Sequence, residues 1–416
     1  MKYKKISKSN YDIYILNETK FKTIYISSGF INEYDDKDIT IEKVISSFLV
    51  SSTKECNNEV LMNKRLMELY KPMIDVYDIF KDKHVKWVDL SFLDEKYTEK
   101  GMNKKTIDFY YNLIFNPNVI ENSFDNDSLN IVKKQLLSTI KLQKENPSYL
   151  SFKDAVKNIS GNSPLKKDMS LKESYVKKCD SNELYKFYKD KIKKSKVIVF
   201  LSGNITDDII NIVENNINNR VYKNEYDNIK DFKVSKVKKS RTIIKNTNFN
   251  QSIVYIFYKL MDLTYREKNV VLPIFNYILG GSSSKLFNNV REKNSLAYYV
   301  YSEFYDIENI LYLTAGINRS NFDKTVKLMI KQVEDMKNGN IMLDEINNSK
   351  EYYLSRLLTI DDNLYLKVNS LIGNLTYDKL MYDEIEKEYL SVTKEEIVSL
   401  ANKLELDFIY LFGGEN

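Results

Sequence analysis

The stretch Ile278–Ser302, ILGGSSSKLFNNVREKNSLAYYVYS, carries the most specific pattern in this chain of 416 residues. Gly280 and Gly281 are placed to end a helix, because glycine is preferred just past a helix C-terminus. The hydroxyls of Ser282–Ser284 can cap the helix that follows. A strand is expected to begin near Tyr299, so the stretch predicts a helix, a tight joint, a second helix and a strand.

Arg291 and Tyr298 flank the joint between that second helix and the strand. Their positions permit two interpretations: an arginine that forms a structural ion pair beside a Schellman-type helix end, or a pair of donors at a binding site. A phosphate-binding loop is disfavoured, because the glycine that should precede Lys285 in a Walker sequence is absent. The residues alone leave the choice between the first two open.

The same order of elements is predicted in both halves of the chain. In the first half, the strand pattern of Phe21–Phe30 leads into a helix over Ile39–Ser52. In the second half, the strand pattern of Ser252–Tyr258 leads into a helix opened by Thr264 and Glu267, which are spaced as a capping box.

The ends of the two halves also match. Residues 182–204 and 395–416 each predict a helix, a short polar joint, an apolar strand and a glycine. Residues 222–241 form a polar, lysine-rich run without apolar periodicity, which indicates a linker. The sequence therefore predicts an α+β protein of two tandem homologous domains, 1–221 and 242–416, each a mostly antiparallel sheet packed with helices.

Composition narrows the class of protein. Hydrophobic residues make up 43% and charged residues 29%, as in a folded, soluble protein. The 63 Lys and Arg against 58 Asp and Glu leave a net charge of +5, which is small for a dedicated nucleic-acid binder. No apolar run reaches the ~18 residues of a membrane span, and no signal peptide is visible at the N-terminus. We expect a cytoplasmic protein without nucleic-acid or membrane partners.

Cysteine and histidine are scarce. Cys56 and Cys179 lie too far apart for a CxxC zinc site, and two cysteines do not form a disulfide framework. The only histidine, His84, lies in the alternating strand pattern His84–Phe92, and the chain has no GxSxG motif. A hydrolase that uses His84 with a serine or cysteine nucleophile is kept as a third hypothesis.

The stretch Ile278–Ser302 resembles the second domain of the pitrilysin/insulinase-type zinc metallopeptidases. The duplicated α+β plan, the linker and the strand endings extend this resemblance over nearly the whole chain. The matching positions are Gly280, Gly281, Ser283, Ser284, Leu286, Phe287, Arg291, Glu292, Leu296, Ala297 and Tyr298.

The resemblance implies that Arg291 and Tyr298 reach into an active site, hold the substrate carbonyl and stabilise the tetrahedral intermediate. A guanidinium and a phenol are donors suited to a developing oxyanion. The resemblance also implies a substrate-binding surface, with the candidate residues Gly280, Gly281, Ser282, Ser283 and Tyr299.

The chain departs from this family at the zinc motif. Catalytic members carry His-x-x-Glu-His on the first long helix, whereas here Lys43, Ser46 and Ser47 stand at those positions. The position of the later carboxylate ligand falls near Val132. Zinc requires a cluster of deprotonated ligands, so we expect no metal or other cofactor in this chain.

Family members that keep the Arg/Tyr pair but lack the zinc motif typically pair with a homologous zinc-motif subunit. The resemblance therefore implies that this chain is such a zinc-less subunit and is inactive alone. The partner would supply zinc, water and the general base, and this chain would supply Arg291 and Tyr298 to complete a heterodimeric peptidase. The chain is similar to bacterial subunits associated with elongation factor P modification or with leader removal from ribosomal peptides, and the sequence does not choose between them. The alternative is a catalytically dead scaffold or peptide-binding subunit of the same fold.

Overall fold

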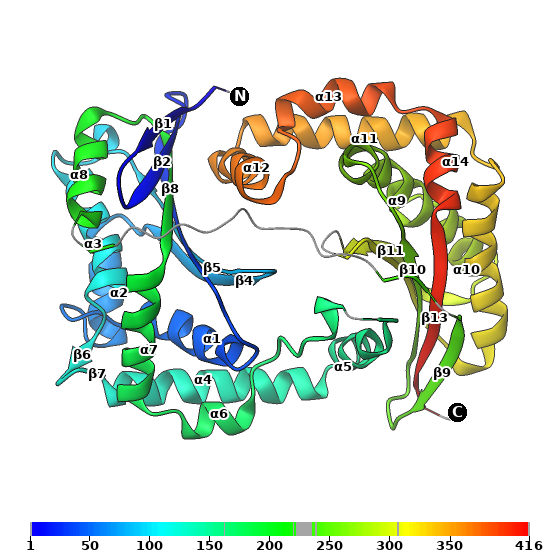
Figure 1. The fold of residues 1–416 in the computed structure, drawn as a ribbon, viewed down its shortest axis with the longest axis horizontal. Helices are drawn as coiled ribbons and strands as arrows, with labels where there is room; N and C mark the ends of the chain where they lie inside the picture. The colour runs from blue at the N-terminus through cyan, green and yellow to red at the C-terminus, as the bar shows by residue number, and fades with distance from the viewer. Residues whose placement is uncertain are drawn as a thin grey trace. The chain divides into compact units, whose positions relative to one another are not determined.

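The computed structural model of the protein describes residues 2–161, 163–218, 220–221, 235–237, 239–305 and 308–414 (Figure 1). The chain forms two compact units. Unit 1 comprises Met1–Leu142, Met169–Ile229 and Asn363–Ile372, and unit 2 comprises Gln143–Asp168, Lys230–Asp362 and Gly373–Asn416. Each unit thus includes a segment from the other half of the chain. Of the expected linker 222–241, residues 222–234 and 238 lie outside the described residues.

Unit 1 is built on a six-stranded sheet in the order β1-β2-β8-β3-β5-β4. All neighbouring strands pair antiparallel except β2 and β8, which are parallel. The strands are β1 (Lys4–Ser7), β2 (Tyr11–Asn17), β3 (Thr23–Asn32), β4 (Met73–Phe80), β5 (His84–Leu93) and β8 (Lys196–Gly203). A separate two-stranded ribbon contains β6 (Val119–Ile120) and β7 (Ser123–Phe124).

Helices of unit 1 form two apolar clusters. Helices α3 (Met102–Phe115) and α8 (Asp207–Ile217) pack their apolar residues on the sheet. Helices α1 (Asp38–Leu49), α4 (Asn126–Glu145) and α7 (Ser181–Lys194) form a second cluster that includes Phe48, Leu129 and Tyr188. The remaining helices are α2 (Glu59–Glu68) and α6 (Glu173–Lys178).

Unit 2 is built on a five-stranded sheet in the order β11-β12-β10-β13-β9. Only β13 and β9 pair in parallel. The strands are β9 (Arg241–Asn246), β10 (Ser252–Leu260), β11 (Ala297–Tyr305), β12 (Ile310–Ile317) and β13 (Leu404–Gly413). Every residue of the central strand β10 is buried, as expected for a strand covered on both faces.

Both faces of this second sheet are covered within unit 2. Helices α9 (Leu272–Gly280), α10 (Phe322–Lys337) and α14 (Lys394–Asn402) cover the face that carries Val254 and Ile256. Helix α5 (Pro147–Ala155) and the residues after it cover the face of Tyr255 and Phe257. The other helices are α11 (Leu343–Asp361), α12 (Leu364–Tyr377) and α13 (Tyr382–Ser391).

The predicted α+β class is confirmed, and so are the local elements that define it. The predicted strand Phe21–Phe30 corresponds to β3, and the predicted helix Ile39–Ser52 corresponds to α1. The capping box forms as predicted: the Thr264 N–H donates to Glu267 Oε2 at 2.7 Å, and the Glu267 N–H donates to Thr264 Oγ1 at 3.2 Å. The strand expected near Tyr299 begins two residues earlier, at Ala297.

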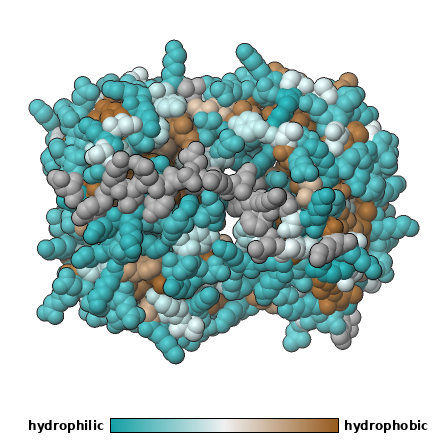
Figure 2. Space-filling model, viewed as in Figure 1, coloured by the Kyte–Doolittle hydropathy of each residue, from teal (hydrophilic) through white to brown (hydrophobic). Residues whose placement is uncertain are grey.

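Hydrophilic residues dominate the face shown in Figure 2, with hydrophobic residues scattered among them. Within the described part of the chain, no helix combines the length and the apolar composition required to cross a bilayer.

Candidate active-site residues

The zinc-motif positions lie on α1, and their side chains are engaged with the protein itself. The Lys43 ammonium donates to the Met169 carbonyl, and the Ser47 hydroxyl donates to the Lys43 carbonyl at 3.0 Å. Ser46 donates to Asp78 Oδ2 at 2.6 Å. Val132 is fully buried in the apolar cluster of α1, α4 and α7. An ammonium, two hydroxyls and an isopropyl group do not fit zinc, which takes thiolate, imidazole or carboxylate ligands.

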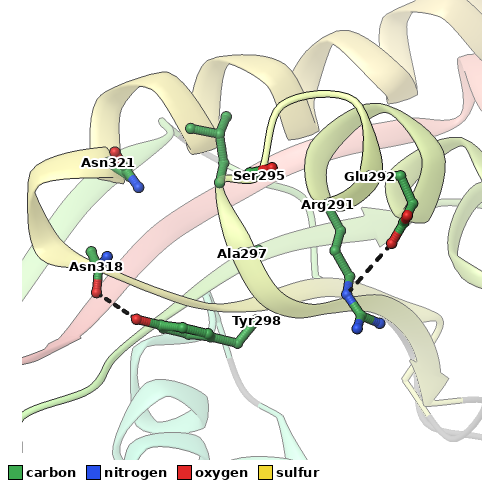
Figure 3. Close-up of a pocket in the computed structure, with 8 residues that line it drawn as sticks. Arg291, Glu292, Ser295, Ala297, Tyr298, Asn318 and Asn321 are labelled. Atoms are coloured by element: carbon green, nitrogen blue, oxygen red, sulfur yellow. Dashed lines mark hydrogen bonds and ion pairs between the residues drawn. The ribbon is translucent and has the colours of Figure 1, made fainter.

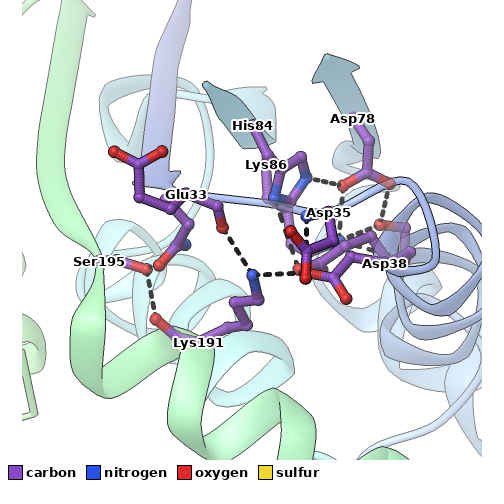
Figure 4. Close-up of polar contacts among 11 residues, drawn as sticks. Glu33, Asp35, Asp38, Asp78, His84, Lys86, Lys191 and Ser195 are labelled. Carbon is purple, nitrogen blue, oxygen red and sulfur yellow. Dashed lines mark hydrogen bonds and ion pairs between the residues drawn. The ribbon is translucent and has the colours of Figure 1, made fainter. Parts of the chain in front are cut away.

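Ser46 thereby contacts a buried ion cluster that includes Asp78, His84 and Lys86, which are labelled in Figure 4. His84 Nε2 and the Lys86 ammonium each lie 2.7 Å from Asp78 Oδ1. Burial alone would raise the pKa of the Asp78 carboxyl, but Lys86 and His84 hold that pKa below its ordinary value. Burial alone would lower the pKa of Lys86, but Asp78 and Glu42 raise it above its ordinary value. The residues come from three separate elements, so the cluster cannot be recognised from the sequence.

His84 is a member of this cluster, and both of its ring nitrogens face carboxylates. Nε2 faces Asp78, and Nδ1 lies 3.5 Å from Glu42 Oε1. The ring stacks on Phe80 with a centroid distance of 4.7 Å. Both ring nitrogens are thus directed at carboxylates, and this placement gives the third hypothesis no support.

The glycines of the 278–302 stretch bring α9 close to β11. Helix α9 ends at Gly280, and the Gly281 N–H donates to the Tyr277 carbonyl at 2.9 Å. A Cβ on Gly280 would lie 2.2 Å from the backbone nitrogen of Ser302 and 2.1 Å from its Oγ. Gly280 is therefore required for the contact between helix and strand, and it is buried.

Arg291 lies on a wide helical turn. Ser284 Oγ accepts a hydrogen bond from the Phe287 N–H at 3.2 Å, which caps the segment as the sequence predicts. The π-helical turn Phe287–Glu292 follows and contains Arg291. Turns of this kind are rare and are often found at functional sites.

Tyr298 is the extra residue of a β-bulge. In the pairing of β11 with β12, Ala297 lies opposite Ile317 and Tyr299 lies opposite Gly316, so Tyr298 has no partner. A bulge can direct one side chain out of the regular alternation. The Tyr298 side chain is 59% exposed, and its hydroxyl donates to Asn318 Oδ1 at 2.8 Å (Figure 3).

Arg291 and Tyr298 line the same cavity, which has a volume of about 410 Å³ (Figure 3). Its lining residues are Arg291, Glu292, Ser295, Leu296, Ala297, Tyr298, Asn318 and Asn321. The Arg291 guanidinium lies over the Phe287 ring at 5.2 Å, and its Nε lies 3.8 Å from Glu292 Oε1. Among the described residues, no hydrogen bond uses the two terminal nitrogens of Arg291, so they can donate to an acceptor in the cavity.

The other candidate substrate-binding residues do not belong to this lining. Gly280 and Gly281 form the helix end, and Ser282 and Ser283 are exposed on the turn that follows. Tyr299 is half-buried against Gly316, and burial raises its pKa above the ordinary value.

The structure adds two asparagines that the sequence analysis missed, Asn318 and Asn321, which follow β12 and enter the cavity lining. In the sequence, these two asparagines are recognisable only as polar residues that follow the apolar strand 310–317. Recognising them requires the pairing of that strand with β11.

Fold and site together define a metallopeptidase-like chain that lacks a set of zinc ligands at the motif positions. Residues 178–353 match the family model described as the peptidase M16 inactive domain. The chain is therefore similar to members of the M16 peptidase family of this inactive type. The predicted relationship to pitrilysin/insulinase-type metallopeptidases is thereby confirmed.

Relatives of known sequence and structure resemble the chain over most of its length. It is 25% identical over 415 residues to the "Probable inactive metalloprotease YmfF" of Bacillus subtilis, covering 96% of this chain and 95% of that protein. A conserved protein from Enterococcus faecalis has a similar structure, with a TM-score of 0.87, 22% identity and 99% of both chains covered. A structure titled peptidase M16 inactive domain, from Pseudomonas fluorescens, has a TM-score of 0.79 at 18% identity, covering 100% of this chain and 98% of that one.

Proposed function

We propose that this chain is the non-zinc-binding subunit of a heterodimeric zinc endopeptidase that processes peptides. A homologous subunit with a His-x-x-Glu-His motif supplies zinc and the general base, and this chain supplies Arg291 and Tyr298. The observation that carries the proposal is the joint placement of these two side chains in one solvent-accessible cavity.

The cavity suits a peptide carbonyl that gains negative charge. Arg291 offers two terminal nitrogens, and Tyr298 offers a hydroxyl at the bulge. Donors of this kind stabilise an oxyanion most strongly when the surrounding structure holds them in place. Phe287 supports the guanidinium, and Asn318 fixes the position of the Tyr298 hydroxyl.

The motif positions on α1 supply the second line of support. Lys43, Ser46 and Ser47 are tied to other protein groups and cannot supply an activated water. A chain that lacks the zinc ligands and the general base but presents Arg291 and Tyr298 requires a second subunit that supplies the missing groups.

The proposal places the heterodimer in the cytoplasm. Cys56 and Cys179 are buried free thiols, which is the usual state of cysteines in a reducing compartment. The proposed substrate class is a peptide, because the chain is similar to M16 peptidases, and the donors in the cavity are compatible with a backbone carbonyl.

The test begins with an affinity pull-down of this chain from its own cells and continues with the purified complex. We expect a zinc-motif protein of similar size to co-purify, with peptide cleavage that a chelator abolishes. Arg291→Ala or Tyr298→Phe should lower turnover by roughly 10²–10³, the usual loss for one oxyanion donor. Size-exclusion chromatography should show that both variants still assemble.

Two exposed residues of unit 2 serve as matched controls. Arg356→Ala removes an exposed guanidinium, and Tyr301→Phe removes a hydroxyl from the same strand as Tyr298. Neither residue lines the cavity, so both control variants should retain turnover. Full turnover in the Arg291 and Tyr298 variants would refute the role assigned to the pair.

The alternative is a scaffold without a catalytic contribution, and one observation favours it. The Tyr298 hydroxyl is already bonded to Asn318, and Arg291 already packs on Phe287 beside Glu292. The scaffold predicts that the chain elutes alone or with a non-peptidase assembly, without zinc and without cleavage.

A further inference from the structure

The buried ion cluster of unit 1 joins three elements and does not belong to the Arg291 cavity. Glu42 lies on α1, Asp78 on β4, and His84 and Lys86 on β5. Each of the four side chains is at most 5% exposed. Burying charged groups this deeply costs desolvation free energy, which ion pairs and hydrogen bonds within the cluster must offset.

Lys86 supplies the cation of the cluster. Its ammonium lies 2.7 Å from Asp78 Oδ1 and 3.3 Å from Glu42 Oε2, and it donates to the Ser46 hydroxyl. Asp78 stands directly opposite Lys86 in the pairing of β4 with β5. The ammonium also donates to the Glu42 backbone carbonyl at 3.3 Å, so four acceptors surround its three donors. Lys86 thus holds α1 and β4 together as a fixed internal cation.

Two polar atoms of the cluster are left without a hydrogen bond. His84 Nδ1 and Glu42 Oε1 point at each other across 3.5 Å, and neither receives a hydrogen bond from the described residues. The imidazole cannot turn away easily, because its ring stacks on Phe80 at an angle of 17°. Buried polar atoms are normally bonded, so this pair indicates that the cluster can accommodate a bridging ion.

The remaining groups form a recognisable donor set. One imidazole nitrogen and one oxygen from each of the two carboxylates lie within 4.8 Å of one another. Zn²⁺ and Co²⁺ bind such nitrogen and oxygen donors. The set is distinct from the zinc-motif positions, although Ser46 is hydrogen-bonded to it.

We propose that Glu42, Asp78 and His84 form a divalent-metal site that the Lys86 ammonium fills in the native chain, so that ammonium and metal ion are alternative occupants. The native chain then needs no metal to hold α1 against β4 and β5. A metal ion binds when the ammonium is removed, because the two positive charges would otherwise repel each other at close range and compete for the carboxylates of Glu42 and Asp78.

The test uses Co²⁺ ions alone as the probe and the full-length chain as the protein. Lys86→Met keeps most of the side-chain volume and removes the charge. We expect this variant to retain one Co²⁺ per chain after dialysis, with the visible absorption of a nitrogen- and oxygen-ligated ion and a higher melting temperature than without Co²⁺. The native chain should retain none and should melt at the same temperature with or without Co²⁺.

Two further variants decide whether the ion occupies this site. Lys86→Met combined with His84→Gln should lose the bound Co²⁺. Lys285→Met removes another buried ammonium, which faces the single carboxylate Glu345 at 3.0 Å, and should acquire no Co²⁺.

The proposal is wrong if Lys86→Met binds no more Co²⁺ than the native chain, or if the double variant still binds it. If Lys86→Met unfolds without metal, circular dichroism should show refolding when Co²⁺ is added, and failure to refold also contradicts the proposal.

Discussion

Gly280 and Tyr298 show how single residues shape the Arg291 cavity. Gly280 lets α9 lie against Ser302 of β11, and the bulge at Tyr298 turns the phenol out of the sheet at the start of the same strand. The cavity therefore depends on one backbone contact and one irregularity in strand pairing.

Gly280→Ala should destabilise the protein. The added methyl group would lie within 2.2 Å of the Ser302 backbone nitrogen, so α9 and β11 would have to move apart. Overpacking of this kind costs about 1–3 kcal/mol, which urea denaturation followed by circular dichroism would measure.

Gly373→Ala is the matched control for this prediction. Gly373 lies within α12, and a Cβ there would meet its nearest neighbour, Lys379 Cβ, at 3.4 Å. Alanine is favoured over glycine inside a helix by about 0.5–1 kcal/mol, so this variant should be as stable as the native chain or more stable. Equal stability of the two variants would contradict the packing role of Gly280.

Helix α5 and the residues that follow it complete unit 2. Phe152 packs on Tyr305 and Tyr312 of the second sheet, with ring centroids 5.7 and 5.3 Å away. The Ser160 N–H donates to Asp407 Oδ2 at 2.8 Å, and Ser163 donates to the buried carboxylate of Glu308. The segment 143–168 is therefore part of the core of unit 2.

A fragment of residues 242–416 should not fold alone. Without residues 143–168, the aromatic face around Tyr255 and Tyr312 would be exposed to water. We expect the fragment to bind a hydrophobic dye and to lack a cooperative thermal transition, whereas the full chain should show one. A cooperatively folded fragment would show that α5 is dispensable.

Local patterns in the sequence predicted the elements of this fold well. The apolar strand patterns of β3 and β10, the capping box at Thr264 and the motif at 278–302 depend on neighbouring residues, which a sequence displays directly. The sequence could not show the bulge at Tyr298, which depends on the partner strand β12. It also could not show the cluster of Glu42, Asp78 and Lys86, because pairing and packing bring these residues together.

Both units contain tyrosines whose ionisation opposes folding. Burial raises the pKa of Tyr11 in unit 1 and of Tyr353 in unit 2 from 10.0 to about 12. The folded state therefore favours the neutral phenols. The resulting stabilisation is fully present below pH 10 and is lost as the pH rises through 12.

The free energy of unfolding should accordingly fall between pH 10 and about 12. We expect the near-ultraviolet absorbance of phenolate to rise together with the loss of far-ultraviolet circular dichroism. Ionisation of all tyrosines while the circular dichroism stays native would contradict this expectation.

The exchange of segments between the two units also affects the order of events on the ribosome. Unit 1 includes Asn363–Ile372, so its last segment emerges only after most of unit 2 has been synthesised. The N-terminal half therefore cannot reach its final state while it is the only part outside the exit tunnel. The apolar surface that buries Leu364, Val368 and Leu371 in the finished protein therefore stays uncovered until these residues emerge, and surface of this kind is prone to aggregation during synthesis.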